Sequence, residues 1–145
     1  MNNKSYLTAI TRKKLSAPMK WLYTHALLQP GLDYGCGKGS DADIMGLVKY
    51  DPYYFPRRWQ SILNERFNLI TCIYVLNVLF PAEQVKVVKE VEDLLAPGGV
   101  AYFAVRRDVS PQGWTKRGTW QCEVLMDLPK LVENKSFCIY KMVKN

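Results

Sequence analysis

The sequence predicts one α/β domain, a doubly wound and mostly parallel sheet with helices on both faces, from three observations. Residues 67–79 form a nearly continuous apolar run rich in Ile, Val and Leu, as in a parallel strand buried on both faces. From Pro81 to Leu95, apolar side chains recur at steps of three and four, which is typical of an amphipathic helix. Residues 100–105 form another apolar run after a Pro-Gly-Gly turn. Strands that alternate with helices favour a parallel sheet.

A capping signal indicates the first helix of the chain. Ser16 is a favourable N-cap residue, and Pro18 suits the first turn of a helix. Apolar residues at helical spacing continue through Leu27 and Leu28, and the Pro-Gly pair that follows them ends a helix. We therefore expect this helix to extend to Leu28.

Short strands and a glycine-rich turn come next, and two further strands end the chain. In chain order, we expect a strand at residues 31–34, a compact turn at 35–39, a helix at 40–45, a strand at 46–50, and the last two strands at 120–126 and 137–143. Only residues 52–66 lie between the second predicted strand and the strand that begins at residue 67.

Length and composition limit the class of protein. A chain of 145 residues that is 48% hydrophobic fits a single domain, here a basic helical segment at residues 1–29 and a core at residues 30–145. No apolar run reaches the roughly 18 residues of a membrane span, and no apolar leader follows the start, so we expect a cytoplasmic protein. Four cysteines without CxxC spacing and one histidine indicate neither a zinc site nor any other metal site.

The charge balance indicates the kind of partner. A net charge of +7 favours polyanions, and nucleic acid is the first candidate, although charge can also serve solubility alone. Some basic residues lie near aromatic residues or at predicted strand ends, where they could bind phosphate groups. The candidate substrate-binding residues are Arg12, Lys13, Lys14, Arg57, Arg58, Arg106 and Arg107.

The turn after the first predicted strand has the features of a nucleoside site. Ligands of open α/β sheets bind at the carboxyl ends of the strands. Glycines at 35–39 allow close backbone approach, and Asp51 ends the next strand, where an acid can bind ribose hydroxyls. Asp51 lies 18 residues after Asp33, close to the spacing of about 20 in dinucleotide sites.

Four ordered segments resemble the motifs of class I methyltransferases that use S-adenosylmethionine. Residues 32–39 look like the family's first motif, and Asp51 stands where the family places its ribose acid. Residues 67–79 are similar to the fourth motif, and residues 94–99 to the turn into the fifth strand. Residues 8–18, together with residues 50–54, also resemble proteins assigned as methyltransferases that are associated with DNA phosphorothioation.

The resemblance implies a Rossmann-like sheet, S-adenosylmethionine as cofactor, S-adenosylhomocysteine as product, and no metal. Tyr74 and Asn77, after the fourth motif, become the catalytic candidates, although Tyr74 also suits a core position and Asn77 a local hydrogen bond. Because only residues 52–66 stand where the family has its second helix and third strand, the resemblance implies a sheet that is reduced between its second and fourth strands. The family's adenine-binding acid, which follows that third strand, has no clear counterpart. The residues that the resemblance assigns to the cofactor are Asp33, Gly35, Cys36, Gly37, Gly39, Asp51, Pro52, Tyr53 and Ile73.

The leading functional hypothesis is a minimal nucleic-acid methyltransferase, acting as a monomer or homodimer without a membrane partner. Ribosomal or transfer RNA ranks ahead of DNA because folded RNA presents unpaired bases without base flipping. A small-molecule methyltransferase and a cofactor-binding accessory protein without turnover remain as alternatives. The small size would also suit a viral protein, which would act in the host cytoplasm.

Overall fold

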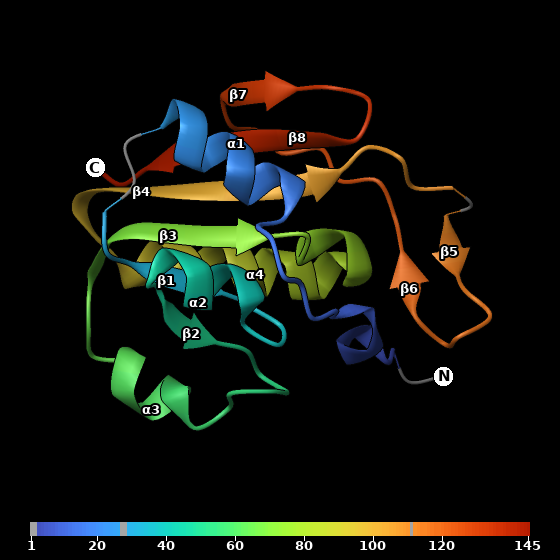
Figure 1. The fold of residues 1–145 in the computed structure, drawn as a ribbon, viewed down its shortest axis with the longest axis horizontal. Coiled ribbons are helices and arrows are strands. Elements are labelled where there is room, and N and C mark those ends of the chain that lie inside the picture. The colour runs from blue at the N-terminus through green and yellow to red at the C-terminus, as the bar shows by residue number, and fades with distance from the viewer. Residues whose placement is uncertain (1–2, 27–28, 111) are drawn as a thin grey trace.

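A single mixed sheet organises the computed structural model, which describes residues 3–26, 29–110 and 112–145 (Figure 1). Its strand order is β2-β1-β3-β4-β8-β7; the first four strands are parallel, and β8 is antiparallel to both β4 and β7. The strands are β1 (Leu32–Tyr34), β2 (Val48–Tyr50), β3 (Phe67–Ile73), β4 (Leu95–Arg106), β7 (Lys130–Glu133) and β8 (Phe137–Val143). The expected mostly parallel α/β fold is confirmed.

Helices cover both faces of the sheet, as the sequence predicts. On one face, Met19 and Leu22 pack in one core cluster with Tyr102 of β4. On the other face, Val91 and Leu94 belong to a second cluster around Phe103. Alternate residues of β4 thus serve opposite cores, as strand geometry requires. The helices are α1 (Ala17–His25) and α2 (Ser40–Met45) on the first face, α4 (Pro81–Leu94) and α3 (Arg58–Ile62) on the second, and the 3-10 turns are η1 (Ser5–Thr8) and η2 (Leu76–Val78).

The predicted N-cap of α1, Ser16, is confirmed, and Ser16 is itself hydrogen-bonded to Asp41 of α2. The Ser16 hydroxyl accepts a hydrogen bond from the Met19 amide at 3.4 Å. Asp41 accepts hydrogen bonds from the Ser16 amide at 2.8 Å and from its hydroxyl at 2.5 Å. The helix ends at His25, earlier than expected, and Leu27 and Leu28 lie outside the described residues.

The central unit agrees with the sequence except at its last boundary. Strand β3 leads into η2, and α4 begins at Pro81. Strand β4 begins at Leu95, directly after α4 and before the turn at residues 97–99, because Leu95 already pairs with Phe67 across a bulge. Between β2 and β3 the described chain forms only the short helix α3, so β2 is an edge strand and the expected reduction is confirmed.

The expected strand at residues 120–126 is wrong for most of its length. Only Trp120–Gln121 (β6) is a strand, and it pairs with Gly113–Trp114 (β5) in a hairpin apart from the main sheet. The apolar side chains that follow, Val124 and Met126 among them, pack over the α4 face without joining the sheet. An apolar run can cover a sheet face as well as extend the sheet, and hydrophobicity alone does not separate the two.

The described residues contain no helix that is long and apolar enough to cross a membrane.

Replacing Gly31 by alanine tests the close approach of β1 and β3. A Cβ atom at Gly31 would lie 2.3 Å from the Leu69 carbonyl oxygen, so the two strands would have to separate. We expect Gly31→Ala to lower the free energy of unfolding by about 2 kcal/mol or more, as overpacking does. Urea denaturation measures the loss.

Gly98→Ala is the matched control for this prediction. Gly98 has a φ of 78° but nothing within 4 Å of its Cβ position, so only backbone strain of about 1 kcal/mol is expected. An equal loss in both variants would contradict the packing argument.

Candidate functional site

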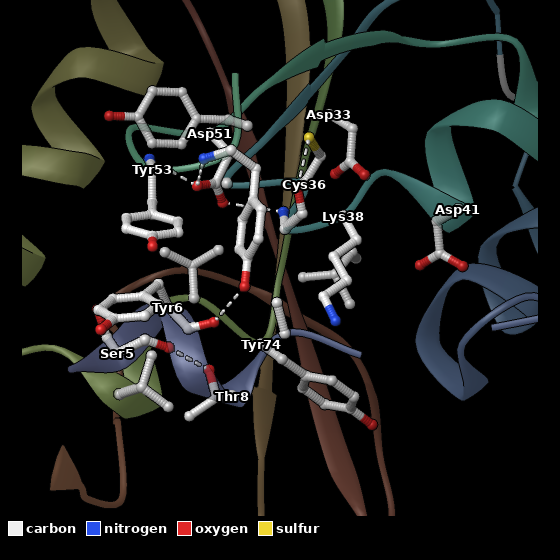
Figure 2. A pocket seen from close by; sticks show the side chains of 18 of the residues that line it. Ser5, Tyr6, Thr8, Asp33, Cys36, Lys38, Asp41, Asp51, Tyr53 and Tyr74 are labelled. Carbon is white, nitrogen blue, oxygen red and sulfur yellow. Dashed lines mark hydrogen bonds between the residues drawn. The ribbon is translucent and has the colours of Figure 1, made fainter. Parts of the chain in front are cut away.

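A pocket of about 220 Å³ opens at the carboxyl ends of the parallel strands β1, β2 and β3 (Figure 2). Its walls come from the glycine turn after β1, the loop after β2, the residues after β3, and the amino-terminal segment. Eight of the predicted cofactor residues line it: Asp33, Gly35, Cys36, Gly37, Asp51, Pro52, Tyr53 and Ile73. Gly39 does not line it and is instead the N-cap of α2.

Glycine is required in the turn because the backbone is left-handed and closely packed there. Gly35 and Gly37 have φ angles of 74° and 59°. A Cβ atom on Gly35 would lie 2.5 Å from a methyl carbon of Val75, and one on Gly37 would lie 3.0 Å from the Cβ of Ala9. The turn therefore presents bare backbone to the pocket.

Asp33 is a buried carboxyl group at the base of the pocket. It is 3% exposed, and its Oδ1 accepts a hydrogen bond from the Thr71 hydroxyl at 2.9 Å. Burial raises the pKa of Asp33 to about 7; the nearby carboxylates of Asp41 and Asp51 also raise it, and the Thr71 hydrogen bond opposes them. Within the described residues, no Lys or Arg forms an ion pair with Asp33. A cation that entered this pocket would stabilise its ionised form.

Asp51 joins the glycine turn to the loop after β2. Its Oδ2 accepts a hydrogen bond from the Gly37 amide at 2.9 Å. Its Oδ1 accepts hydrogen bonds from the amides of Tyr53, at 2.8 Å, and Tyr54, at 3.0 Å. A carboxylate offers about four acceptor positions, so these three bonds leave capacity for a ligand hydroxyl.

Residues 3–12, here called the strap, form a wall of the pocket that the sequence did not reveal. The Tyr6 ring stacks on Tyr53 with centroids 4.0 Å apart and an interplanar angle of 9°. The Tyr54 hydroxyl donates a hydrogen bond to the Tyr6 carbonyl oxygen at 2.8 Å. Figure 2 shows Tyr6 and Thr8 across the pocket from Asp33. No local pattern in the strap indicates a contact with residues almost 50 positions away.

Tyr74 lies in the pocket wall in a strained backbone conformation. Its φ is 60°, the only positive value for a non-glycine residue in the part of the chain that the structure describes. Such strain is concentrated at functional sites. The Tyr74 amide donates to the Ala104 carbonyl at 2.8 Å, and the Arg106 guanidinium lies 5.5 Å from the Tyr74 ring centroid. Asp108 holds that guanidinium through two hydrogen bonds, at 3.0 and 3.1 Å.

Asn77 does not line the pocket, and its side chain is 1% exposed. Its Oδ1 accepts a hydrogen bond from the Arg106 amide at 2.6 Å, and its Nδ2 donates to the Cys122 carbonyl at 2.9 Å. The amide group therefore joins the end of β4 to the chain after the hairpin. This geometry positions Arg106, while no atom of Asn77 faces the cavity.

The structure does not gather the predicted basic residues into one cluster. Arg12 lines the pocket, Arg106 lies beside Tyr74, and Lys38, which the sequence did not single out, also lines the cavity. Arg107 is outside the pocket lining and pairs with Glu133 at 2.6 Å. The remaining predicted basic residues are exposed and outside the lining: Lys13, Lys14, Arg57 and Arg58.

Comparisons with known proteins agree with the fold. A family model described as a methyltransferase domain matches residues 11–138. The N-methyltransferase NodS of Bradyrhizobium japonicum, solved with S-adenosylhomocysteine, is similar with a TM-score of 0.58 and 18% identity, over 88% of this chain and 85% of NodS. A Burkholderia thailandensis 1,6-didemethyltoxoflavin-N1-methyltransferase, solved with its namesake ligand and S-adenosylhomocysteine, gives 0.59 and 15%, over 88% and 77%. No curated protein matches the sequence.

The raised pKa of Asp33 predicts a characteristic dependence of stability on pH. The folded state holds the proton up to about pH 7, whereas an ordinary aspartate releases it near 3.8. The folded state thus binds more protons in this range, so the free energy of unfolding falls as pH rises, by at most about 1.4 kcal/mol per pH unit. Urea unfolding between pH 4 and 8 measures this slope.

Asp33→Asn isolates the contribution of this one group. Asparagine can still accept the Thr71 hydrogen bond but does not titrate. We expect the variant to lose the downward slope between about pH 4 and 7 and to be more stable than the wild type above pH 7. Parallel curves for the two proteins would show that Asp33 does not titrate in this range.

Proposed function

We propose that this chain, which belongs to the methyltransferase domain family and is an S-adenosylmethionine-dependent methyltransferase, transfers the methyl group to a nucleic acid, with RNA ahead of DNA. The observation that carries this proposal is the placement of basic side chains at the pocket. Arg12 and Lys38 are exposed in its lining, which also contains Asp33, Asp41 and Asp51. Arg106, paired with Asp108, lies over Tyr74, and the chain has a net charge of +7. Cations at this position favour a polyanionic substrate.

The residues of the pocket fit S-adenosylmethionine, which supplies a methyl group on a positively charged sulfur when bound. Asp33 is a buried carboxyl group that would be stabilised by a cationic ligand. Asp51 retains acceptor capacity for ribose hydroxyls, and the turn at Gly35 and Gly37 offers close backbone approach. The Tyr53 ring, which is stacked on Tyr6, would contact the adenine from one side, in place of the acid that the family usually supplies.

The remaining assigned residues would complete the cofactor site in two ways. Cys36, Pro52 and Ile73 would contact the cofactor from the pocket wall. Gly39 would act indirectly, by starting α2 below the turn. Burial raises the pKa of the Cys36 thiol, which fits a neutral contact better than a nucleophile.

Alignment of donor and acceptor is the main task of the protein in this reaction. Tyr74 is the residue we assign to the acceptor, because its ring lies in the pocket wall beside Arg106. Asn77 serves as a positioning residue for Arg106 and makes no contact with the acceptor. Arg12 lines the pocket, and Arg106, although paired with Asp108, lies over the ring of Tyr74 in the pocket wall, so we assign these two to the acceptor's phosphates. Arg57, Arg58 and Arg107 lie outside the pocket lining and would contribute only to a longer contact.

We further propose that residues 1–145 act as one unit in a cytoplasm. The basic segment 1–29 supplies the strap, and residues 30–145 supply the cofactor-binding core. The four cysteines are free thiols, which fits a reducing compartment.

A small-molecule acceptor is the second candidate, favoured by the strap. Tyr6 stacks on Tyr53 in the wall of the pocket of about 220 Å³ that contains the predicted cofactor site, which limits the room for an acceptor beside the cofactor. The structurally similar Burkholderia enzyme was solved with a small ligand, 1,6-didemethyltoxoflavin. A reaction with a metabolite that does not depend on salt would support this candidate over nucleic acid.

Transfer of a labelled methyl group from S-adenosylmethionine decides between these acceptors. Ribosomal RNA, transfer RNA, DNA, protein and small-molecule fractions of a cell extract are offered separately. We expect label in an RNA fraction, decreasing as salt rises. Label only in the small-molecule fraction would overturn the proposed substrate. Saturable cofactor binding with no label anywhere would indicate a protein without turnover.

Gly37→Arg is the negative control for this assay. The φ of 59° and the 3.0 Å approach to Ala9 leave no room for a side chain, so the arginine would distort or fill the cofactor site. We expect this variant to lose both cofactor binding and methyl transfer. Label that persists in it would come from another enzyme.

Substitution of Tyr74 tests its assignment to the acceptor. We expect Tyr74→Ala to lower turnover about tenfold or more, since the loss of a base-stacking ring has an effect of this size. Affinity for S-adenosylhomocysteine, measured by calorimetry, should change less than about threefold. Tyr74→Phe keeps the ring and should retain most of the activity. An equal loss of cofactor affinity and turnover would instead place Tyr74 in the cofactor site.

A further inference from the structure

The net charge of the chain comes from two separate segments. Residues 1–32 contain no Asp or Glu and five of the 20 Lys and Arg residues. Residues 109–122 also contain no acid and carry Lys116 and Arg117. The thirteen basic residues elsewhere balance the 13 acidic residues, so the rest of the molecule is neutral. A charge of +7 is thus concentrated in less than a third of the sequence.

The fold brings these two segments together, although they lie about 100 residues apart. The Lys4 amide donates a hydrogen bond to the Gly118 carbonyl at 3.1 Å, and the Arg117 guanidinium donates to the Leu7 carbonyl at 2.9 Å. The Trp120 amide donates to the Asn3 side chain at 3.1 Å. Figure 1 shows the amino-terminal turn beside the β5–β6 hairpin. Residues 3–14 and 113–121 are here called the strap–hairpin surface.

A rigid aromatic side chain lies on this surface. Trp114 is 39% exposed, and its ring packs edge-on against Phe80, at 5.6 Å, and Trp120, at 5.7 Å. The turn beneath it is fixed by the hydrogen bond from the Thr115 amide to the Thr119 carbonyl at 2.8 Å. Lys116 is exposed in the same turn. An ordered aromatic ring among cations is the arrangement that binds single-stranded nucleic acid.

The same surface continues into the methyl-transfer pocket. Tyr6, Thr8 and Arg12 belong to the strap and line the pocket. A chain bound along the strap–hairpin surface could therefore place one of its bases at the pocket, next to Tyr74. An anionic membrane would also be attracted by these charges. Membrane binding, however, would not account for the connection of this surface to the pocket or for the single packed ring of Trp114.

We propose that the strap–hairpin surface binds single-stranded RNA and leads the acceptor base to the pocket, an inference that rests on the proposed function. Lys13, Lys14 and Lys116 contact phosphates, and Trp114 stacks on a base. Arg117 instead fixes the hairpin to the strap, because its guanidinium is bonded to the Leu7 carbonyl.

Binding of a fluorescently labelled, unstructured oligouridine of about 12 nucleotides tests the proposal by anisotropy over a series of salt concentrations. The variant Lys13→Ala/Lys14→Ala/Lys116→Ala removes three exposed charges for which no hydrogen bond or ion pair is seen in the described residues. We expect its dissociation constant to rise about tenfold or more at 0.1 M salt. The slope of log K against log salt should fall by about 2, at roughly 0.7 per phosphate contact on a single strand.

Lys86→Ala/Lys89→Ala/Lys135→Ala is the matched control, with the same change in charge on exposed positions outside the surface. We expect it to bind the oligonucleotide within about twofold of the wild type. Trp114→Ala should weaken binding about fivefold or more without changing the salt slope, since stacking releases no counterions. Equal losses in the two triple variants would overturn the proposal.

Three further measurements separate the possible outcomes. Binding to phosphatidylglycerol vesicles without binding to the oligonucleotide would make the surface a membrane contact and overturn the proposal. Unchanged affinity of the surface variants for S-adenosylhomocysteine shows that they are folded. RNA methylation that is unaffected by the surface variants would overturn this inference and leave the proposed function in place. Oligonucleotide binding that depends on the surface, without any methylation of nucleic acid, would support the surface and overturn the proposed function.

Discussion

The carboxylate of Asp51 is the interaction on which the candidate site depends. It accepts hydrogen bonds from the amide of Gly37 on one side and from the amides of Tyr53 and Tyr54 on the other. These bonds hold the glycine turn against the loop after β2. They also place the Tyr53 ring where Tyr6 stacks on it, so the amino-terminal strap is connected to the turn through Asp51. One acidic side chain at the end of an edge strand thus joins three segments of the pocket wall.

Close backbone packing fixes the other side of the pocket. Gly35 meets the side chain of Val75, and Gly31 meets the carbonyl of Leu69, so β1 lies nearer to β3 than any larger residue would allow. Asp33 is carried into the interior by this packing, and burial rather than any neighbouring charge is the main cause of its raised pKa. The sheet is short at its β2 edge, but the packing between β1 and β3 preserves the base of the pocket.

The distribution of charge gives the molecule two distinct parts. The core of the fold is electrically balanced, and the excess of positive charge belongs to segments that lie outside the main sheet. Hydrogen bonds involving Lys4, Arg117 and Asn3 join those segments beside the pocket. The pocket and the strap–hairpin surface therefore share the strap, whose residues contribute to both. A substrate bound to the basic surface would contact the wall of the pocket.

The sequence alone determined the parts of this protein that depend on local chemistry. Ser16, the glycine turn and the start of α4 at Pro81 are signals read within a few residues, because capping, left-handed turns and helical periodicity are short-range effects. The tertiary structure decided what depends on packing between distant segments. These features are the contact of Tyr6 with Tyr53, the hydrogen bond from the Arg106 amide to the buried side chain of Asn77, and the packing of Val124 over the α4 face of the sheet. Apolar or polar character at these positions is compatible with several partners, and only the assembled fold selects one.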